Sequence, residues 1–136
     1  MHDYKLIALD LDGTLLNSNK QLSAENAAAL RLASSRGVQI VPTTGRFFDG
    51  MPQIIRALPY LNYAITINGA QVQDLHSGEI VYRAELPLPR ALAILEYLDT
   101  LPVIYDCYCG NWGWMTRAMQ EQAAQFISDP HSLKMV

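Results

Sequence analysis

Apolar residues along this 136-residue chain gather in short runs that end in polar or glycine-containing turns. Residues 6–9 form such a run and predict a strand that is buried on both faces. Residues 24–36 are rich in Ala and Leu and predict a helix, with Ser23 as its N-cap and Gly37 as the residue that ends it. Residues 38–41 predict a second apolar strand. A strand, a helix and a strand in this order predict a right-handed crossover with parallel pairing.

The next segments continue the alternation of strands and helices. Residues 47–58 predict a weaker helix. Gly50 and Pro52 fall near its start, so we expect its first turn to be loose or the helix to begin late. Residues 63–67 predict a third strand. Residues 71–75 and 79–86 predict a β-hairpin, because they flank a short turn that contains glycine.

A Pro-Leu-Pro segment at residues 87–89 predicts passage into a second unit, so we expect domains at residues 1–84 and 85–136. The second unit is predicted to contain a helix at 91–98, a strand at 103–109, a returning strand at 112–115 and a helix at 119–127. Trp112 and Trp114 fall on the returning strand. They suit packing within the hairpin, and a role in lining a substrate pocket is the alternative.

Two carboxylates follow the first predicted strand directly. Asp10 and Asp12 are two positions apart, so an extended segment would direct both to one side and turn Leu11 toward the core. Gly13 and Thr14 then predict a tight turn whose N–H groups can hold an anion. Paired carboxylates suit Mg²⁺, and the turn suits a phosphate. The segment therefore favours metal-assisted phosphoryl transfer over a purely structural acidic turn.

The next two predicted strands also end in groups that suit a phosphate. Thr44, Gly45 and Arg46 offer a hydroxyl, backbone N–H groups and a guanidinium to an anion. Taken alone, they favour a capped turn with a solvated arginine, and the carboxylate pair after the first strand reverses that balance. Asn68 and Gly69 follow the third strand, where a simple tight turn is the alternative. Because parallel strands share one carboxyl edge, we expect all these residues at one site.

The sequence from Asp10 to Leu15, DLDGTL, resembles the first motif of the haloacid dehalogenase superfamily of aspartate-nucleophile phosphatases. This resemblance implies an α/β fold, a Rossmann-like parallel-sheet core. It also implies that Asp10 is the nucleophile and a Mg²⁺ ligand. Asp12 is then the general acid and base and a second metal ligand through its backbone carbonyl. The backbone of Leu11 and Gly13 would contact the phosphate.

The later strand ends fit the same resemblance. The Thr44-Gly45-Arg46 segment resembles the superfamily's second motif, with Thr44 as the phosphate-binding hydroxyl and Arg46 as a substrate contact. The Asn68-Gly69-Ala70 string resembles the Cof-like branch, which carries a large type IIB cap. That branch places Asn68 and Gly69 near the substrate and implies that residues after 84 begin an α/β cap.

Two motifs that the resemblance implies have no counterpart here. The third motif of the superfamily is a lysine that stabilises the aspartyl-phosphate, and the fourth is an acidic cluster, usually Gly-Asp, that completes the Mg²⁺ site. After Arg46 the chain has one lysine, Lys134, and no Gly-Asp turn follows a later apolar strand. We therefore expect an incomplete core, weak Mg²⁺ binding and little or no turnover by this chain alone. We also expect the chain to be a fragment, a truncated reading frame or one half of an assembly. A homodimer or another association would cover the incomplete sheet.

The composition and the N-terminal sequence limit which classes of binding partner and which cellular compartment we expect. Half of the residues are apolar, 17% are charged and the net charge is −3, which fits a folded domain and favours neither nucleic acid nor an anionic membrane. The N-terminus lacks a signal-peptide pattern, so we expect a cytoplasmic location. Cys107 and Cys109 are expected to be free thiols, because thiols two residues apart on a strand are poorly placed for a disulfide. The three histidines are scattered, and we assign none to a metal.

We expect a Mg²⁺-dependent phosphatase of small phosphorylated metabolites, such as sugar phosphates, that works through an aspartyl-phosphate. The first alternative is a phosphomutase of the same fold, which would exchange label between sugar positions without releasing phosphate. The second is a non-catalytic phosphate-binding or interaction remnant, which would bind phosphate esters without turnover.

Overall fold

The structure is a computed structural model that describes residues 3–110 and 112–126. The chain divides into two compact units, Met1–Ala84 and Glu85–Val136. Within the described residues, no helix has the length and apolar character needed to cross a lipid bilayer.

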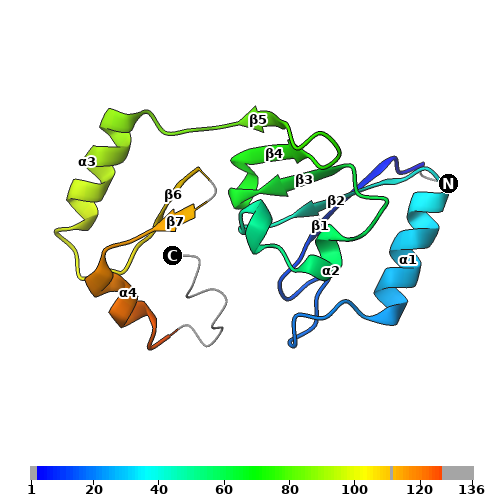
Figure 1. The fold of residues 1–136 in the computed structure, drawn as a ribbon, viewed down its shortest axis with the longest axis horizontal. Helices are drawn as coiled ribbons and strands as arrows, with labels where there is room; N and C mark the ends of the chain where they lie inside the picture. The colour runs from blue at the N-terminus through cyan, green and yellow to red at the C-terminus, as the bar shows by residue number, and fades with distance from the viewer. Residues whose placement is uncertain (1–2, 111, 127–136) are drawn as a thin grey trace. The chain divides into compact units, whose positions relative to one another are not determined.

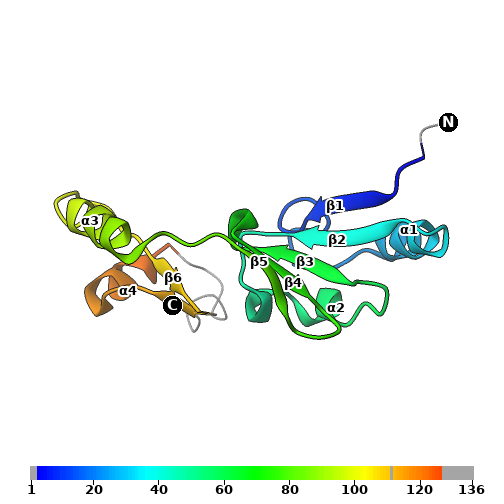
Figure 2. The same ribbon diagram turned by 90° about the horizontal axis from the view of Figure 1, so that it is seen from above.

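The first unit is a mixed α/β unit built on one sheet (Figure 1). Its elements are β1 (Leu6–Asp10), α1 (Ala24–Ser35), β2 (Gln39–Thr43), η1 (Phe48–Gly50), α2 (Gln53–Arg56), β3 (Tyr63–Thr66), η2 (Ile67–Gly69), β4 (Gln71–Asp74) and β5 (Ile80–Arg83). The strand order is β1-β2-β3-β4-β5. The β1–β2 and β2–β3 pairs are parallel, and the β3–β4 and β4–β5 pairs are antiparallel. Seen from above, successive strands rotate in the usual twist (Figure 2). The predicted parallel pairing across the first helix is confirmed.

Helix α1 has the ends that its sequence predicts. The Ser23 hydroxyl accepts a hydrogen bond from the Asn26 N–H at 3.1 Å, which satisfies one of the helix's unpaired donors. Gly37 has a φ of 81°, a left-handed conformation that a glycine adopts without steric cost. The helix ends at Ser35, one residue before its predicted end, and Gly37 turns the chain toward β2.

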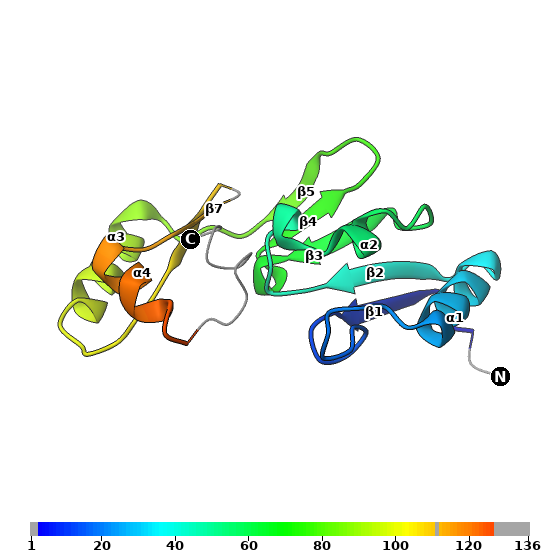
Figure 3. The same ribbon diagram turned by 60° about the horizontal axis from the view of Figure 1, so that its bottom comes forward.

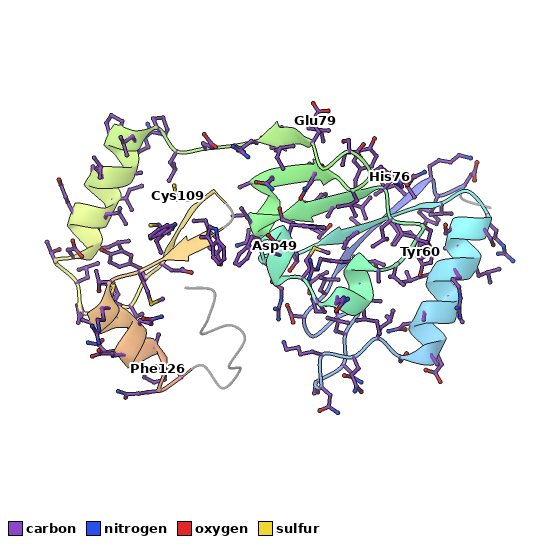
Figure 4. The ribbon with its side chains drawn as sticks, viewed as in Figure 1. Asp49, Tyr60, His76, Glu79, Cys109 and Phe126 are labelled. Atoms are coloured by element: carbon purple, nitrogen blue, oxygen red, sulfur yellow. The ribbon has the colours of Figure 1, made fainter. Side chains whose placement is uncertain are left out.

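The core lies on one face of the sheet. Leu30 of α1 and Ile55 of α2 pack in one buried cluster with Ile40 of β2 and Ala64 of β3, and α1 lies along β1 and β2 in Figure 3. Tyr60 packs against the same cluster and lies beside α1 in Figure 4. Burial raises the pKa of its hydroxyl.

The face of β1 that points away from the core is exposed, contrary to one prediction. The strand was expected to be buried on both faces, yet Leu6 is 55% exposed and Ala8 is exposed, while Ile7 and Leu9 are half-buried against the core. β1 is an edge strand, and the helices described in this unit pack on the other face of the sheet. An apolar run therefore marked the strand correctly but overstated how much of it is buried.

Two further elements differ from their predicted bounds. The helix expected over 47–58 is divided into η1 and α2, because Pro52 has no N–H to donate and instead stands at the N-cap of α2. The third strand ends at Thr66, since Ile67 and Asn68 both adopt a φ of 52° and turn the chain. That turn brings residues after β3 back toward the end of β2.

The second unit contains α3 (Leu88–Leu98), β6 (Cys107–Cys109), β7 (Trp112–Trp114) and α4 (Arg117–Ala123). β6 and β7 pair antiparallel, so the predicted hairpin is present with a first strand shorter than 103–109. Helix α3 begins earlier than expected because Pro89 fits its first turn, where a missing N–H costs no hydrogen bond. The predicted end of the last helix at residue 127 lies outside the described residues.

The aromatic and sulfur side chains of the hairpin are mostly exposed. Trp112 and Trp114 are 58% and 59% exposed and stand opposite Cys109 and Cys107 across the hairpin. Their packing within the hairpin and a role in lining a substrate pocket stay predictions. Their neighbour Gly113 is buried, which leaves the tryptophans on the solvent side of the strand. Cys107 is a half-buried free thiol, and Cys109 is an exposed free thiol on β6 (Figure 4).

Candidate active site

The turn after β1 is held by a buried leucine and by its own backbone. Leu11 is fully buried, as predicted, and its carbonyl accepts the Leu16 N–H at 2.9 Å. Gly13 has a φ of 76°, the left-handed conformation that lets the chain reverse here. Asp10 is exposed at the strand end, and its Oδ2 accepts the Thr14 hydroxyl at 2.8 Å. The turn thus presents one carboxylate to solvent with a fixed orientation.

The end of β2 lies beside this turn. Asp10 pairs in register with Thr43, so the next residue, Thr44, follows the adjacent strand end. Thr44 is 4% exposed, and its Oγ1 accepts the backbone N–H of Arg46 at 3.2 Å. Because the oxygen acts as the acceptor, the hydroxyl hydrogen can be donated to an anion. The role of Thr44 in binding phosphate stays a prediction.

Arg46 and Asp12 bind each other, which the sequence did not predict. Arg46 Nε lies 2.7 Å from Asp12 Oδ2, and Arg46 Nη2 lies 3.0 Å from Asp12 Oδ1, a two-pronged ion pair. Arg46 Nη1 also donates to the Gly50 carbonyl at 2.9 Å. Arg46 was expected to contact substrate, and in this structure its guanidinium is directed instead to the second carboxylate.

A second cation reaches the same carboxylate. Lys20 Nζ lies 2.7 Å from Asp12 Oδ1. The hydrogen bond from Arg46 lowers the pKa of Asp12 to about 2; burial opposes this shift, and the Lys20 hydrogen bond and the two positive charges reinforce it. Asp12 is therefore ionised at neutral pH in this state and has no proton to donate.

The Asn68 turn braces the Thr44 turn. The backbone N–H of Ile67 donates to the Arg46 carbonyl at 3.0 Å, and that of Asn68 donates to the Thr44 carbonyl at 3.2 Å. Gly69 continues the turn with a φ of 94°. The structure therefore places Asn68 and Gly69 against the phosphate-binding candidates, where the backbone contacts of this turn support the loop. Direct contact of Asn68 or Gly69 with substrate stays a prediction.

The two turns approach closely at Gly45 and Asn68. A Cβ at Gly45 would lie 2.9 Å from Asn68 Oδ1, closer than such atoms approach in proteins. We expect Gly45→Ala to lower the free energy of unfolding by about 1 kcal/mol, because Asn68 must move. Urea denaturation measures this change.

The Asn68→Gly variant tests whether the close contact with Asn68 causes the loss of stability in Gly45→Ala. Asn68→Gly removes the obstructing side chain and suits the φ of 52° at that position. In the Asn68→Gly background, Gly45→Ala should cost nothing measurable. An undiminished cost in that background would show that the contact is not the cause.

The carboxylates fit a hard divalent cation in donor type but do not complete a metal centre. Asp10 offers an exposed carboxylate oxygen, and oxygen is the ligand type that Mg²⁺ prefers. The side chain of Asp12 is already bound by Arg46 and Lys20. Among the described residues, no group of three or more His, Cys, Asp or Glu side chains could hold a metal ion.

Sequence reasoning missed Lys20. It lies in the turn between the first strand and the first helix, outside every motif that the sequence suggested. An asparagine-rich turn, Asn17-Ser18-Asn19, precedes it, but that pattern predicts a loop and says nothing about where the lysine is directed. The contact with Asp12 depends on the folded turn.

Comparison with known proteins identifies the family. Residues 7–134 match the haloacid dehalogenase-like hydrolase family. "Phosphatase YwpJ" of Bacillus subtilis is 38% identical over 79% of this chain and 37% of its own length. "Pyridoxal phosphate phosphatase YbhA" of Escherichia coli is 35% identical over 70% of this chain and 35% of its own length. The chain thus spans little more than a third of these two relatives.

Solved structures share the fold. A haloacid dehalogenase-like hydrolase from B. subtilis superposes with a TM-score of 0.72 and 33% identity, over 95% of this chain and 48% of its own. A subclass IIB sugar phosphatase superposes with a TM-score of 0.62 over 71% of this chain and 37% of its own chain. Because the two sequences are 23% identical, this match is evidence for a shared fold only. With its DLDGTL turn at the end of a parallel strand, this chain belongs to the haloacid dehalogenase-like hydrolase family.

Proposed function

We propose that this chain carries the nucleophile and phosphate-binding part of a phosphatase that acts on small phosphorylated metabolites. The observation that carries the proposal is the exposed Asp10 carboxylate at the end of β1, in register with the strand that leads to the Thr44 hydroxyl. A relative named for pyridoxal phosphate supports a small phosphate ester as substrate. Sugar phosphates are the substrate class that we favour.

In the proposed reaction, a carboxylate oxygen of Asp10 attacks phosphorus and the ester P–O bond breaks. The leaving oxygen departs as an anion where that anion is stable, and otherwise takes a proton from Asp12. Thr44 and the turn N–H groups orient the phosphate. Water then attacks the aspartyl-phosphate, and the ionised Asp12 accepts its proton, so that phosphate leaves and Asp10 is restored. When bound, Mg²⁺ would offset the negative charge shared by the phosphate and the carboxylates.

The protonation state of Asp12 bears on the first step. An alkoxide leaving group needs a proton, and Asp12 is ionised while Arg46 and Lys20 hold it. Protonated Asp12 would therefore require those cations to turn toward the substrate. A leaving group that is stable as an anion needs no such proton, which makes p-nitrophenyl phosphate a suitable first substrate.

Capture of the covalent intermediate tests the proposal. After incubation with p-nitrophenyl phosphate and MgCl₂ and an acid quench, we expect mass spectrometry to find one added phosphoryl group on the peptide that contains Asp10. Asp10→Asn should abolish it. Asp3→Asn, which alters an exposed carboxylate paired with Lys5 outside the site, should leave it unchanged.

The same incubation measures turnover. We expect the release of p-nitrophenol by this chain to be slow, because the described residues lack a full metal centre. Robust Mg²⁺-dependent hydrolysis that Asp10→Asn abolishes would contradict slow turnover while supporting the function. Label that appears on another residue, or that survives Asp10→Asn, would contradict the function itself.

A further inference from the structure

Lys20 lies in a turn that its own hydrogen bonds hold in one shape. Asn17 Oδ1 accepts the backbone N–H groups of Asn19 at 2.9 Å and of Gln21 at 3.0 Å. The Lys20 N–H donates to the Asn17 carbonyl at 2.9 Å. Lys20 itself has a φ of 59°, a left-handed conformation that is uncommon for a residue with a side chain. The turn therefore presents the lysine from a defined backbone position.

This turn is tied directly to the DLDGTL turn. Leu16 forms isolated bridges with Asp12 on one side and with Leu22 on the other. Leu16 is 2% exposed, so the segment that leads into the Lys20 turn is anchored in the core. These contacts bring the Lys20 ammonium to 2.7 Å from Asp12 Oδ1. Its position at the site thus follows from the backbone as well as from the ion pair.

Lys20 is a surplus cation at Asp12. Arg46 alone already donates to both carboxylate oxygens, and Lys20 shares Oδ1 with Arg46 Nη2. An ammonium has three donors, and the side chain of Lys20 is 51% exposed, so donors remain for another acceptor. Exposed ion pairs contribute little to the free energy of folding, so the ion pair with Asp12 does not by itself explain a lysine at this position.

The charge balance of the site indicates what the surplus cation is suited to bind. Asp10 and Asp12 carry two negative charges, and Arg46 and Lys20 carry two positive charges. A phosphate monoester would bring up to two further negative charges next to the carboxylates. Without Lys20, Asp10, Asp12 and Arg46 would have a net negative charge before any phosphate arrived, and that charge would repel the phosphate.

We propose that Lys20 is a phosphate-binding residue of this site, donating a hydrogen bond to a non-bridging oxygen of the substrate phosphate beside Asp12. The proposal deepens the proposed function and rests on it. It extends the site beyond the strand ends that carry the family motifs, to the turn that precedes α1.

Binding of inorganic phosphate tests the proposal without requiring turnover. In ³¹P NMR titrations of the 136-residue chain at fixed ionic strength with MgCl₂, we expect Lys20→Met to raise the phosphate Kd about tenfold, which corresponds to about 1.4 kcal/mol. Lys20→Arg keeps the charge and should stay within about threefold of wild type. Lys5→Met removes the same charge at the opposite end of β1, beside Asp3, and should change nothing.

A double-mutant cycle with Asp12→Asn separates direct binding from an effect through Asp12. If Lys20 contacts phosphate, Lys20→Met weakens binding in both backgrounds. An effect that disappears in the Asp12→Asn background would overturn the proposal, because Lys20 would then act by positioning Asp12. So would unchanged phosphate affinity in Lys20→Met while Thr44→Val weakens binding.

The remaining outcome also decides the question. A wild-type chain that binds no phosphate in the titration would overturn the role of Lys20. The proposed function is judged separately, by the phosphoryl group captured on Asp10, so the two failures are distinguishable.

Discussion

Leu11→Ala is expected to lower the free energy of unfolding by about 3 kcal/mol, because it empties a fully enclosed position. Leu11 is fully buried and belongs to the core cluster that joins the sheet to α1 and α2. Truncation removes its apolar contacts and leaves a cavity beneath the turn between Asp10 and Asp12. Urea denaturation, with the midpoint and the slope compared with wild type, measures the loss.

Leu32→Ala is the matched control for this change. Leu32 lies on α1 and is 53% exposed, and leucine and alanine have similar helix propensity, so we expect a change within about 0.5 kcal/mol. Equal losses in the two variants would show that Leu11 does not anchor the turn.

Arg46→Met is expected to lower the free energy of unfolding by about 2 kcal/mol at neutral pH. The change removes both hydrogen bonds to Asp12 and the hydrogen bond to the Gly50 carbonyl, and it leaves Lys20 as the remaining cation at that carboxylate. The Asp12 side chain is 32% exposed, so solvent screening keeps this loss below that for a fully buried pair. Arg117→Met, at a 90% exposed ion pair with Glu121, should cost within about 0.5 kcal/mol.

The pH dependence of the Arg46→Met effect has a definite sign. The pKa of Asp12 is lowered from 3.8 to about 2 in the folded chain, so the ion pair stabilises the fold above about pH 4. That contribution is lost as the pH falls through the folded pKa. The stability difference between wild type and Arg46→Met should therefore shrink between about pH 4 and pH 2.

The Asp12 carboxyl can also be followed directly. In ¹³C NMR titrations its pKa should rise toward the ordinary value in Arg46→Met and should stay low in Arg117→Met. Identical titration of Asp12 in wild type and Arg46→Met would contradict the ion pair.

Local signals in the sequence were sufficient to predict most helices, strands and turns of the first unit. Ser23 and Gly37 mark the ends of α1 because capping and left-handed φ are properties of single residues. The turn at Gly13 and the burial of Leu11 follow from the same kind of short-range chemistry. The α/β class and the family were also predictable, since a strand that ends in DLDGTL is a local pattern.

Burial was less predictable than the elements themselves. An apolar run predicts a strand, but the exposure of Leu6 depends on which strand is at the edge and which face the helices cover. Trp112 and Trp114 are likewise exposed because of the side of the hairpin on which they fall. These are consequences of long-range packing, which a window of neighbouring residues does not contain.

By itself, the sequence determined which residues are candidates for the chemistry: two carboxylates in one tight turn, and a threonine and an arginine after the next strand. The tertiary structure alone decided how they pair. It joined Arg46 to Asp12 across 34 positions of sequence and brought Lys20 to the same carboxylate from a separate turn. Side-chain ion pairs of this kind depend on backbone placement between distant segments, and that placement exists only once the strands have packed.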